Sequence, residues 1–218
     1  MSAIASYSVT ALESLSQRVK AITQRGGIIA VPTETYYGLG VDPFNQKAVD
    51  RLLAAKGRET GRPILVLIGS LEQLSLLVQV VSSAASILID AFWPGPLTIL
   101  FPAHPSLPRN LTAGTGLVGV RLSSCQPLRE LLLRVGPLTG TSANRTGAPP
   151  AQTAEAVQEA LQDEVELIVD AGPTPGGLPS TVVEAQESPR IIREGAIERA
   201  AIEAALGARG FYLNLSEM

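Results

Sequence analysis

Histidine and cysteine are almost absent from this chain, and their scarcity excludes several kinds of site. The 218 residues contain one histidine, His104, and one cysteine, Cys125. A lone cysteine cannot form a disulfide within the chain, which is typical of a reducing, cytoplasmic setting. The two residues together cannot build a structural zinc site. We expect no Ser-His-Asp triad either, because His104 lies in a proline-flanked turn and is interpreted as a solvated loop residue.

Aromatic residues and net charge are also low, and both bear on binding partners. Aromatics make up 4% of the sequence, too few for a platform on which single-stranded nucleic acid could stack. The net charge of -3 argues against broad electrostatic capture of nucleic acid. No apolar run reaches about 18 residues and no basic-then-apolar leader opens the chain, so we expect neither a membrane span nor secretion.

What the chain does have is a large apolar fraction. Hydrophobic residues make up 45% of the sequence, which is enough for a packed core. We expect one domain over residues 1–218. A C-terminal helix and short tail are expected over about 197–218.

Helical and extended patterns alternate along the chain, but several strands are joined by loops alone. This pattern predicts an α/β fold with a twisted mixed sheet and flanking helices. The periodicity predicts helices over 11–25, 46–56, 71–79 (capped by Ser70), 83–91, 126–135, 153–161 and 197–206. Strands are predicted over 28–31, 64–68, 97–101, 117–122, 137–141 and 165–169, with a hairpin of 181–184 and 190–193.

The segment Pro32–Gly40 is the most informative candidate site. It follows a buried strand and supplies the hydroxyls of Thr33 and Thr35, the carboxylate of Glu34 and two glycines. In open α/β sheets, ligands bind beyond the carboxyl ends of strands. The alternative is that these hydroxyls bond only to the backbone of their own turn. A second motif that precedes a strand, Trp93–Thr98, is interpreted as structural.

A cationic segment suits an anionic ligand. Lys56 and Arg58, with Arg62 close by, precede the strand 64–68. An arginine fork and a lysine point charge both suit phosphate groups. They do not belong to a Walker A loop, because no G-x-x-x-x-G-K-[ST] pattern occurs in the chain. The alternative is a solvated helix end that faces the helix dipole.

Four further polar features follow or end predicted strands. Residues 139–147 offer small hydroxyl and amide side chains, and residues 176–181 form a glycine-rich loop that ends in two hydroxyls. Arg121 lies in an apolar strand, where a charge pairs with a protein carboxylate or a ligand. Arg193 ends another strand, and the neighbouring Glu194 is an alternative partner for it.

Taken in order, these segments resemble a known family. The matching motifs are Pro32-Thr-Glu-Thr-Tyr-Tyr-Gly-Leu-Gly40, Lys56-Gly-Arg58 with Pro63, Trp93-Pro-Gly-Pro-Leu-Thr98, Val120-Arg121, Ser142-Ala-Asn144, Ser180-Thr181 and Arg193-x-Gly195. Each motif is weak alone, but their order and spacing are highly specific, and the resemblance implies a domain core over about residues 15–196. The chain resembles the single-domain form of the YrdC-like family of L-threonylcarbamoyladenylate synthases.

The resemblance implies a YrdC-like fold around a concave, cationic cavity, and a nucleotidyltransferase reaction. In that reaction L-threonine, bicarbonate and ATP give threonylcarbamoyl-AMP and pyrophosphate. Mg²⁺ is expected to arrive with the ATP phosphates, without a metal site built by the protein. The product is expected to pass to a tRNA threonylcarbamoyl transferase complex, which modifies an adenosine of tRNA, and a weak direct contact with tRNA is an additional expectation.

Position by position, the resemblance also implies two sets of site residues. The set that holds L-threonine comprises Thr33, Arg121, Ser142 and Ser180. The set that contacts ATP comprises Lys56, Arg58, Asn144 and Arg193. Lys56 and Arg58 are also the expected catalytic residues, because they can neutralise charge that builds at the α-phosphorus. Three positions depart from the family pattern, namely Leu67, Ser123 in place of a common proline, and Glu184.

Two other functions fit parts of the sequence. A module could bind double-stranded RNA or tRNA in the same cationic cavity without turnover, although the charge of -3 and the scarce aromatics count against it. The third hypothesis is a carbamoyl-transfer domain of the kind used in hydrogenase maturation. Such domains usually lie in much longer chains with zinc-finger-like cysteines, and this chain has one cysteine.

Overall fold

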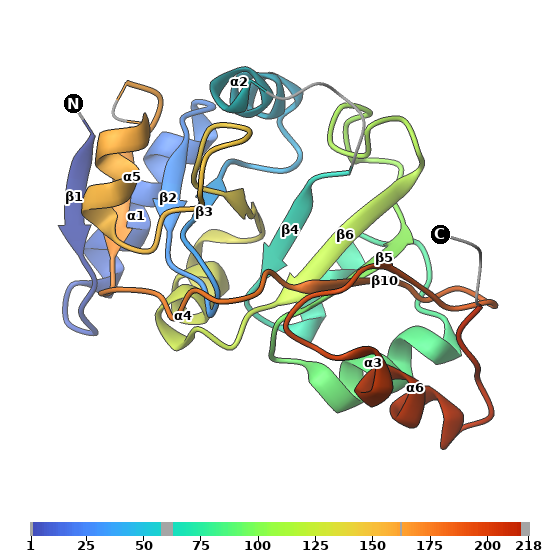
Figure 1. Ribbon diagram of the computed structural model, residues 1–218. Helices are drawn as coiled ribbons and strands as arrows, with labels where there is room; N and C mark the ends of the chain where they lie inside the picture. Colours follow the sequence, from blue (N-terminus) through green and yellow to red (C-terminus); the bar gives the residue numbers. More distant parts are fainter. Residues whose placement is uncertain (1, 58–62, 162, 215–218) are drawn as a thin grey trace.

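Two mixed β-sheets form the body of the protein, and helices pack against them (Figure 1). The computed structural model describes residues 2–57, 63–161 and 163–214. The predicted α/β class, with mixed strand pairing and flanking helices, is confirmed. The strands are divided between two sheets, however, where the sequence suggested one.

The first sheet has five strands, in the spatial order β1 (Ala3–Ser6), β9 (Leu167–Asp170), β2 (Ile29–Val31), β3 (Gly38–Gly40) and β8 (Thr141–Ser142). Strands β1, β9 and β2 pair in parallel, whereas β3 pairs antiparallel with both β2 and β8. Helix α5 (Ala154–Leu161) contacts β9, and α1 (Leu12–Gln24) contacts β2 and α4 (Gln126–Val135).

The second sheet has six strands, in the order β11 (Arg190–Arg193), β10 (Thr181–Glu184), β5 (Leu97–Pro102), β6 (Leu117–Leu122), β4 (Leu65–Ile68) and β7 (Leu138–Thr139). The β10–β5 and β6–β4 pairs are parallel, and the other pairs are antiparallel. Helices α3 (Ser83–Phe92) and α6 (Arg199–Gly207) pack together at the lower right of Figure 1, and α2 (Gln46–Lys56) lies at the top.

A single glycine separates the two sheets along the chain. Strand β7 pairs with β4 in the second sheet and β8 pairs with β3 in the first, with only Gly140 between them. The Gly140 N–H donates to the Leu65 carbonyl at 2.8 Å, and a Cβ on Gly140 would lie 2.5 Å from side-chain atoms of Leu67. The chain crosses between the sheets where a side chain would not fit, so the predicted strand 137–141 is split into two.

An apolar cluster holds the two sheets in position relative to each other. Leu15 of α1 and Leu131 of α4 are buried in it. The same cluster contains Ile29 and Leu167 from the first sheet and Leu67 from the second. Burying one such side chain stabilises a fold by about 1.5–3 kcal/mol. Because both sheets contribute to the cluster, this burial stabilises their packing against each other.

Most predicted elements are confirmed, including the β10–β11 hairpin and the bounds of α2 and α4. The helix predicted over 71–79 is wrong: the structure has a short 3-10 helix, η1 (Leu71–Leu76), and the Ser70 side chain does not cap it. The pattern also misses β1, whose residues are largely exposed, and β3, which contains two glycines. Among the described residues, no helix is long and apolar enough to cross a membrane.

Candidate active site

A cavity of about 630 Å³ lies between the two sheets. Gly38 and Ser142 line it from the first sheet, and Leu65 and Val182 line it from the second. The basic side chains among its described lining residues are Lys56, Arg121 and Arg193. One cavity therefore receives residues from segments spread over most of the chain.

The predicted site residues that the structure describes all line this cavity. They are Thr33, Lys56, Arg121, Ser142, Asn144, Ser180 and Arg193. Arg58 lies outside the described residues. Thr98 and Tyr36, which were not predicted as site residues, also line the cavity.

The turn after β2 uses the hydroxyl of Thr33 to hold its own backbone. The Thr33 Oγ1 atom accepts from the N–H groups of Thr35 at 3.1 Å and Tyr36 at 3.2 Å, and donates to the Tyr36 carbonyl at 2.7 Å. The alternative prediction, that hydroxyls of this turn bond to the backbone of the turn itself, therefore holds for Thr33. The residue nevertheless also lines the cavity. These bonds fix the turn that carries Glu34.

Lys56 lies in the last turn of α2 and reaches the segment after β8. The side chain of Asn45 caps the start of this helix, and Gly57, in the left-handed conformation with φ of 57°, ends it. The Lys56 Nζ atom donates to the carbonyl oxygens of Ser142 at 2.5 Å and Asn144 at 2.9 Å. Lys56 is buried, so these oxygens compensate for the water that its ammonium group has lost.

Asn144 holds the turn that receives Lys56. Its Nδ2 atom donates to the carbonyls of Arg145 at 3.0 Å and Ala148 at 2.6 Å, and its Oδ1 atom lies 3.4 Å from Lys56 Nζ. The Ser142 hydroxyl lies 3.5 Å from the same Nζ atom. The Lys56 motif and the Ser142–Asn144 motif, 86 residues apart, therefore form one unit.

A second unit forms around Ser180. The Ser180 and Thr98 hydroxyls are 2.9 Å apart, and Arg193 Nη2 donates to the Ser180 carbonyl at 2.7 Å. The alternative that Glu194 pairs with Arg193 is wrong, because Glu194 pairs with Arg199 at 2.9 Å. The motif that was interpreted as structural thus also contributes Thr98 to the cavity.

Three close contacts position the segments around Ser180. A Cβ on Gly195 would lie 2.2 Å from the Pro179 carbonyl oxygen, so glycine allows the chain after β11 to approach Ser180. The Gly176 N–H donates to the Thr35 carbonyl at 2.8 Å, and the Tyr36 hydroxyl donates to the Gly177 carbonyl. The loop 171–180 is therefore tied to the turn after β2.

Arg121 and Glu34 form a buried ion pair in the cavity wall. Arg121 Nε lies 3.4 Å from Glu34 Oε1, and the two side chains are 4% and 12% exposed. The other carboxylate oxygen, Glu34 Oε2, accepts a hydrogen bond from the Ser123 hydroxyl. Pairing of Arg121 with a protein carboxylate, one of the two predicted outcomes, is confirmed, and Arg121 also lines the cavity.

Burial shifts the pKa of one member of this pair, Arg121, and of the nearby Cys125. Burial lowers the pKa of the Arg121 guanidinium group below its ordinary value, and the Glu34 carboxylate acts in the opposite direction. Burial raises the pKa of the Cys125 thiol, which disfavours the nucleophilic thiolate. His104 is exposed and bonds to Ser106 at 2.7 Å, so its interpretation as a solvated loop residue is confirmed.

Comparison with known proteins identifies the family. Residues 21–195 match the model of the Sua5/YciO/YrdC family, which carries the description "Telomere recombination". The chain belongs to the Sua5/YciO/YrdC family. It is similar to the threonylcarbamoyl-AMP synthase of Pyrococcus abyssi, with 37% identity over 84% of this chain and 55% of the relative. It is also similar to that of Pseudomonas aeruginosa PAO1, with 36% identity over 71% of this chain and 83% of the relative.

Solved structures of this family share the fold. The crystal structure of P. abyssi Sua5 complexed with L-threonine superposes with a TM-score of 0.88 and 31% identity, over 98% of this chain and 62% of that one. Escherichia coli YciO superposes with a TM-score of 0.81 over 93% of this chain and all of that one. At 24% identity, the likeness to YciO shows the fold alone. This chain spans little more than half the length of the archaeal synthase.

Proposed function

We propose that this chain is an L-threonylcarbamoyladenylate synthase whose residues form one catalytic domain. It would convert L-threonine, bicarbonate and ATP to threonylcarbamoyl-AMP and pyrophosphate. The observation that carries this proposal is the convergence of Lys56, Arg121, Arg193 and Ser180 on one cavity in a chain of this family. The threonine-bound relative with the same fold supports the choice of amino acid.

The threonine half of the proposed site centres on Arg121. The guanidinium group can hold an α-carboxylate with two parallel hydrogen bonds, and burial strengthens such a contact. The hydroxyls of Ser142 and Ser180 can exchange hydrogen bonds with the amino and hydroxyl groups of threonine. Thr33 contributes through the turn that its hydroxyl holds.

The nucleotide half of the proposed site comprises Lys56, Arg58, Asn144 and Arg193. The carbamate oxygen of N-carboxythreonine would attack the α-phosphorus of ATP, form the new P–O bond and expel pyrophosphate. Two carbonyl oxygens of the protein position Lys56, so little reorganisation is needed when charge develops on the phosphate. The chemistry needs positioning and charge neutralisation rather than a nucleophilic side chain.

Mg²⁺ would enter this site with its substrate. Among residues 2–57, 63–161 and 163–214, no group of three or more histidine, cysteine, aspartate or glutamate side chains could hold a metal ion. Mg²⁺ bound to the ATP phosphates needs no such cage. In a cytoplasmic setting the product would pass to a tRNA threonylcarbamoyl transferase complex, and a weak direct contact between this chain and tRNA would accompany that transfer.

Omitting substrates one at a time tests the proposal. The purified protein should release pyrophosphate and form an AMP-containing product only when L-threonine, bicarbonate and Mg-ATP are all present. Pyrophosphate release and liquid chromatography of the nucleotide products measure both. Tight binding of double-stranded RNA or tRNA without pyrophosphate release would reject the synthase and favour the binding module.

A further inference from the structure

We infer that Ser123 is a positioning residue for threonine binding, because it fixes Glu34 and, through Glu34, the guanidinium group of Arg121. This inference rests on the proposed function, since it concerns how the threonine half of the site is set. Neither Ser123 nor Glu34 is needed to touch the substrate. Each acts through the orientation of Arg121.

The Ser123 hydroxyl has one defined orientation. Its oxygen accepts from the Cys125 N–H at 3.2 Å, and its proton goes to Glu34 Oε2. The residue is fully buried, so water does not compete for either bond. Ser123 also lies between β6 and α4, and both elements restrain its backbone.

The Glu34 carboxylate depends on this hydroxyl. Among the described residues, Ser123 is the only one that donates a hydrogen bond to Glu34. The second oxygen, Oε1, is buried without a hydrogen bond and faces Arg121 Nε at 3.4 Å. A buried carboxylate with a single donor takes its orientation from that donor.

The orientation of the Arg121 guanidinium group depends in turn on Glu34. Arg121 Nε is also buried without a hydrogen bond, so the part of the guanidinium group open to the cavity is its outer end. Bidentate binding of a carboxylate requires that end to be held in one plane. The charge contact between Arg121 Nε and Glu34 Oε1, at the inner end of the guanidinium group, fixes the orientation of this plane.

The same bond joins the two walls of the cavity. Glu34 follows β2 in the first sheet, whereas Arg121 and Ser123 belong to β6 and its end in the second. A proline, which resemblance to the family leads one to expect at position 123, has no hydroxyl to make this link. The link is therefore a property of chains that carry a hydroxyl at this position.

Steady-state kinetics of Ser123→Ala test the inference. We expect the KM for L-threonine to rise about three- to tenfold, with the KM for ATP and the kcat within about twofold of the wild-type values, since a lost charge-assisted hydrogen bond is only partly transmitted to Arg121. Ser123→Thr retains the donor and should restore the threonine KM. Arg121→Lys keeps the charge but loses the planar guanidinium group. Its threonine KM gives the reference for a change at the binding residue itself.

Ser16→Ala is the matched control. Ser16 is an equally buried serine whose hydroxyl donates to the Glu13 carbonyl at 2.8 Å in α1, and it does not line the cavity. It should change neither KM. If Ser123→Ala fails to fold, Ser123→Cys keeps a similar volume with a weaker donor and should also raise the threonine KM selectively.

Two outcomes would overturn the inference. A folded Ser123→Ala protein with unchanged threonine KM, or with both KM values raised equally, would show that Ser123 has no selective role in threonine binding. The wild-type assay separates this from failure of the proposed function. If wild-type pyrophosphate release does not depend on L-threonine, the proposed function and the inference are rejected together.

Discussion

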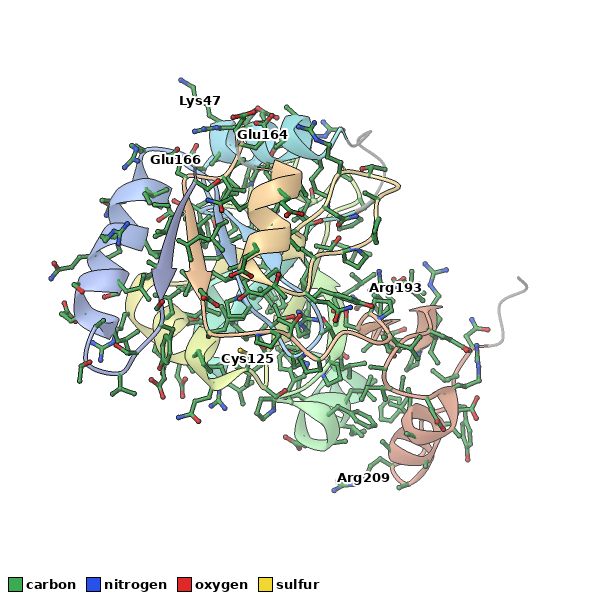
Figure 2. All side chains as sticks on the ribbon, turned by 60° about the vertical axis from the view of Figure 1, so that its left-hand side comes forward. Lys47, Cys125, Glu164, Glu166, Arg193 and Arg209 are labelled. Atoms are coloured by element: carbon green, nitrogen blue, oxygen red, sulfur yellow. The ribbon has the colours of Figure 1, made fainter. Side chains whose placement is uncertain are left out.

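Two ion-paired regions of this protein contain the same chemical groups in opposite surroundings. Glu166 pairs with Arg25 and, at 3.1 Å, with Arg51 on the surface, where the arginine side chains are 58% and 45% exposed. Figure 2 shows Glu166 together with Glu164 and Lys47 at one end of the molecule, away from Arg193. Glu34 pairs with Arg121 in the cavity wall, where the arginine is 4% exposed.

The difference teaches that burial, rather than distance, separates a solvated ion pair from one that shapes a site. The surface contact at 3.1 Å is shorter than the buried one at 3.4 Å. Water and salt screen the surface charges, so such pairs contribute about 0.2–1 kcal/mol. In the cavity wall, removing one partner leaves the other charge buried and uncompensated, which costs about 3–5 kcal/mol.

The largest expected effect follows from breaking the buried pair. Arg121→Met should lower the free energy of unfolding by about 3–5 kcal/mol, because Glu34 then keeps a buried charge without its partner. Adding Glu34→Gln should recover much of that loss. Urea denaturation of both variants measures this. A loss below about 1 kcal/mol for Arg121→Met would mean that the cavity pair is as well solvated as the surface pair.

An intermediate effect is expected at Lys56, the buried cation in the nucleotide half of the proposed site. Lys56→Ala should lower kcat/KM for ATP by at least about tenfold, since losing a charge-assisted contact costs roughly 1.5–3 kcal/mol. Lys47→Ala, at the exposed start of the same helix, is the control and should leave turnover unchanged. Near-normal turnover of Lys56→Ala would place Lys56 outside the phosphate site.

The smallest effect is expected at the surface. Glu166→Gln should lower the free energy of unfolding by less than about 1 kcal/mol. In 1 M NaCl, where the Debye length falls to about 3 Å, this difference should disappear, whereas the loss caused by Arg121→Met should persist. Denaturation of both variants at low and high salt makes the comparison. Equal salt dependence of the two would remove the distinction between the regions.

Much of the fold could be predicted because its signals are local. The apolar spacing of Leu15 and Val19 predicts α1, and the hairpin of β10 and β11 follows from two short apolar runs. The single predicted sheet could not be refined from sequence, because the break at Gly140 arises from the position of Leu67, far away in the chain. The edge strand β1 has too few buried residues to show a pattern.

The candidate site was predicted as a set of separate motifs, but not as a network. Thr33 was predicted to contact substrate; the structure shows that it lines the cavity and that its hydroxyl also bonds within its own turn. Thr98 was not predicted as a site residue, because the motif 93–98 was interpreted as structural. The motif does have such a role: the Trp93 indole N–H donates to the Leu97 carbonyl at 2.7 Å. No sequence signal links Ser123 to Glu34, because the two residues follow strands of different sheets and lie far apart in the chain.

The sequence by itself determined which polar residues follow which strands, and their order was enough to indicate the family. Periodicity and turn chemistry act over a few residues, so a linear pattern records them. Only the tertiary structure decided that Lys56 meets Asn144 and that Arg121 is backed by Glu34. These contacts depend on how two sheets pack over a shared apolar cluster, and packing joins residues that no local pattern relates.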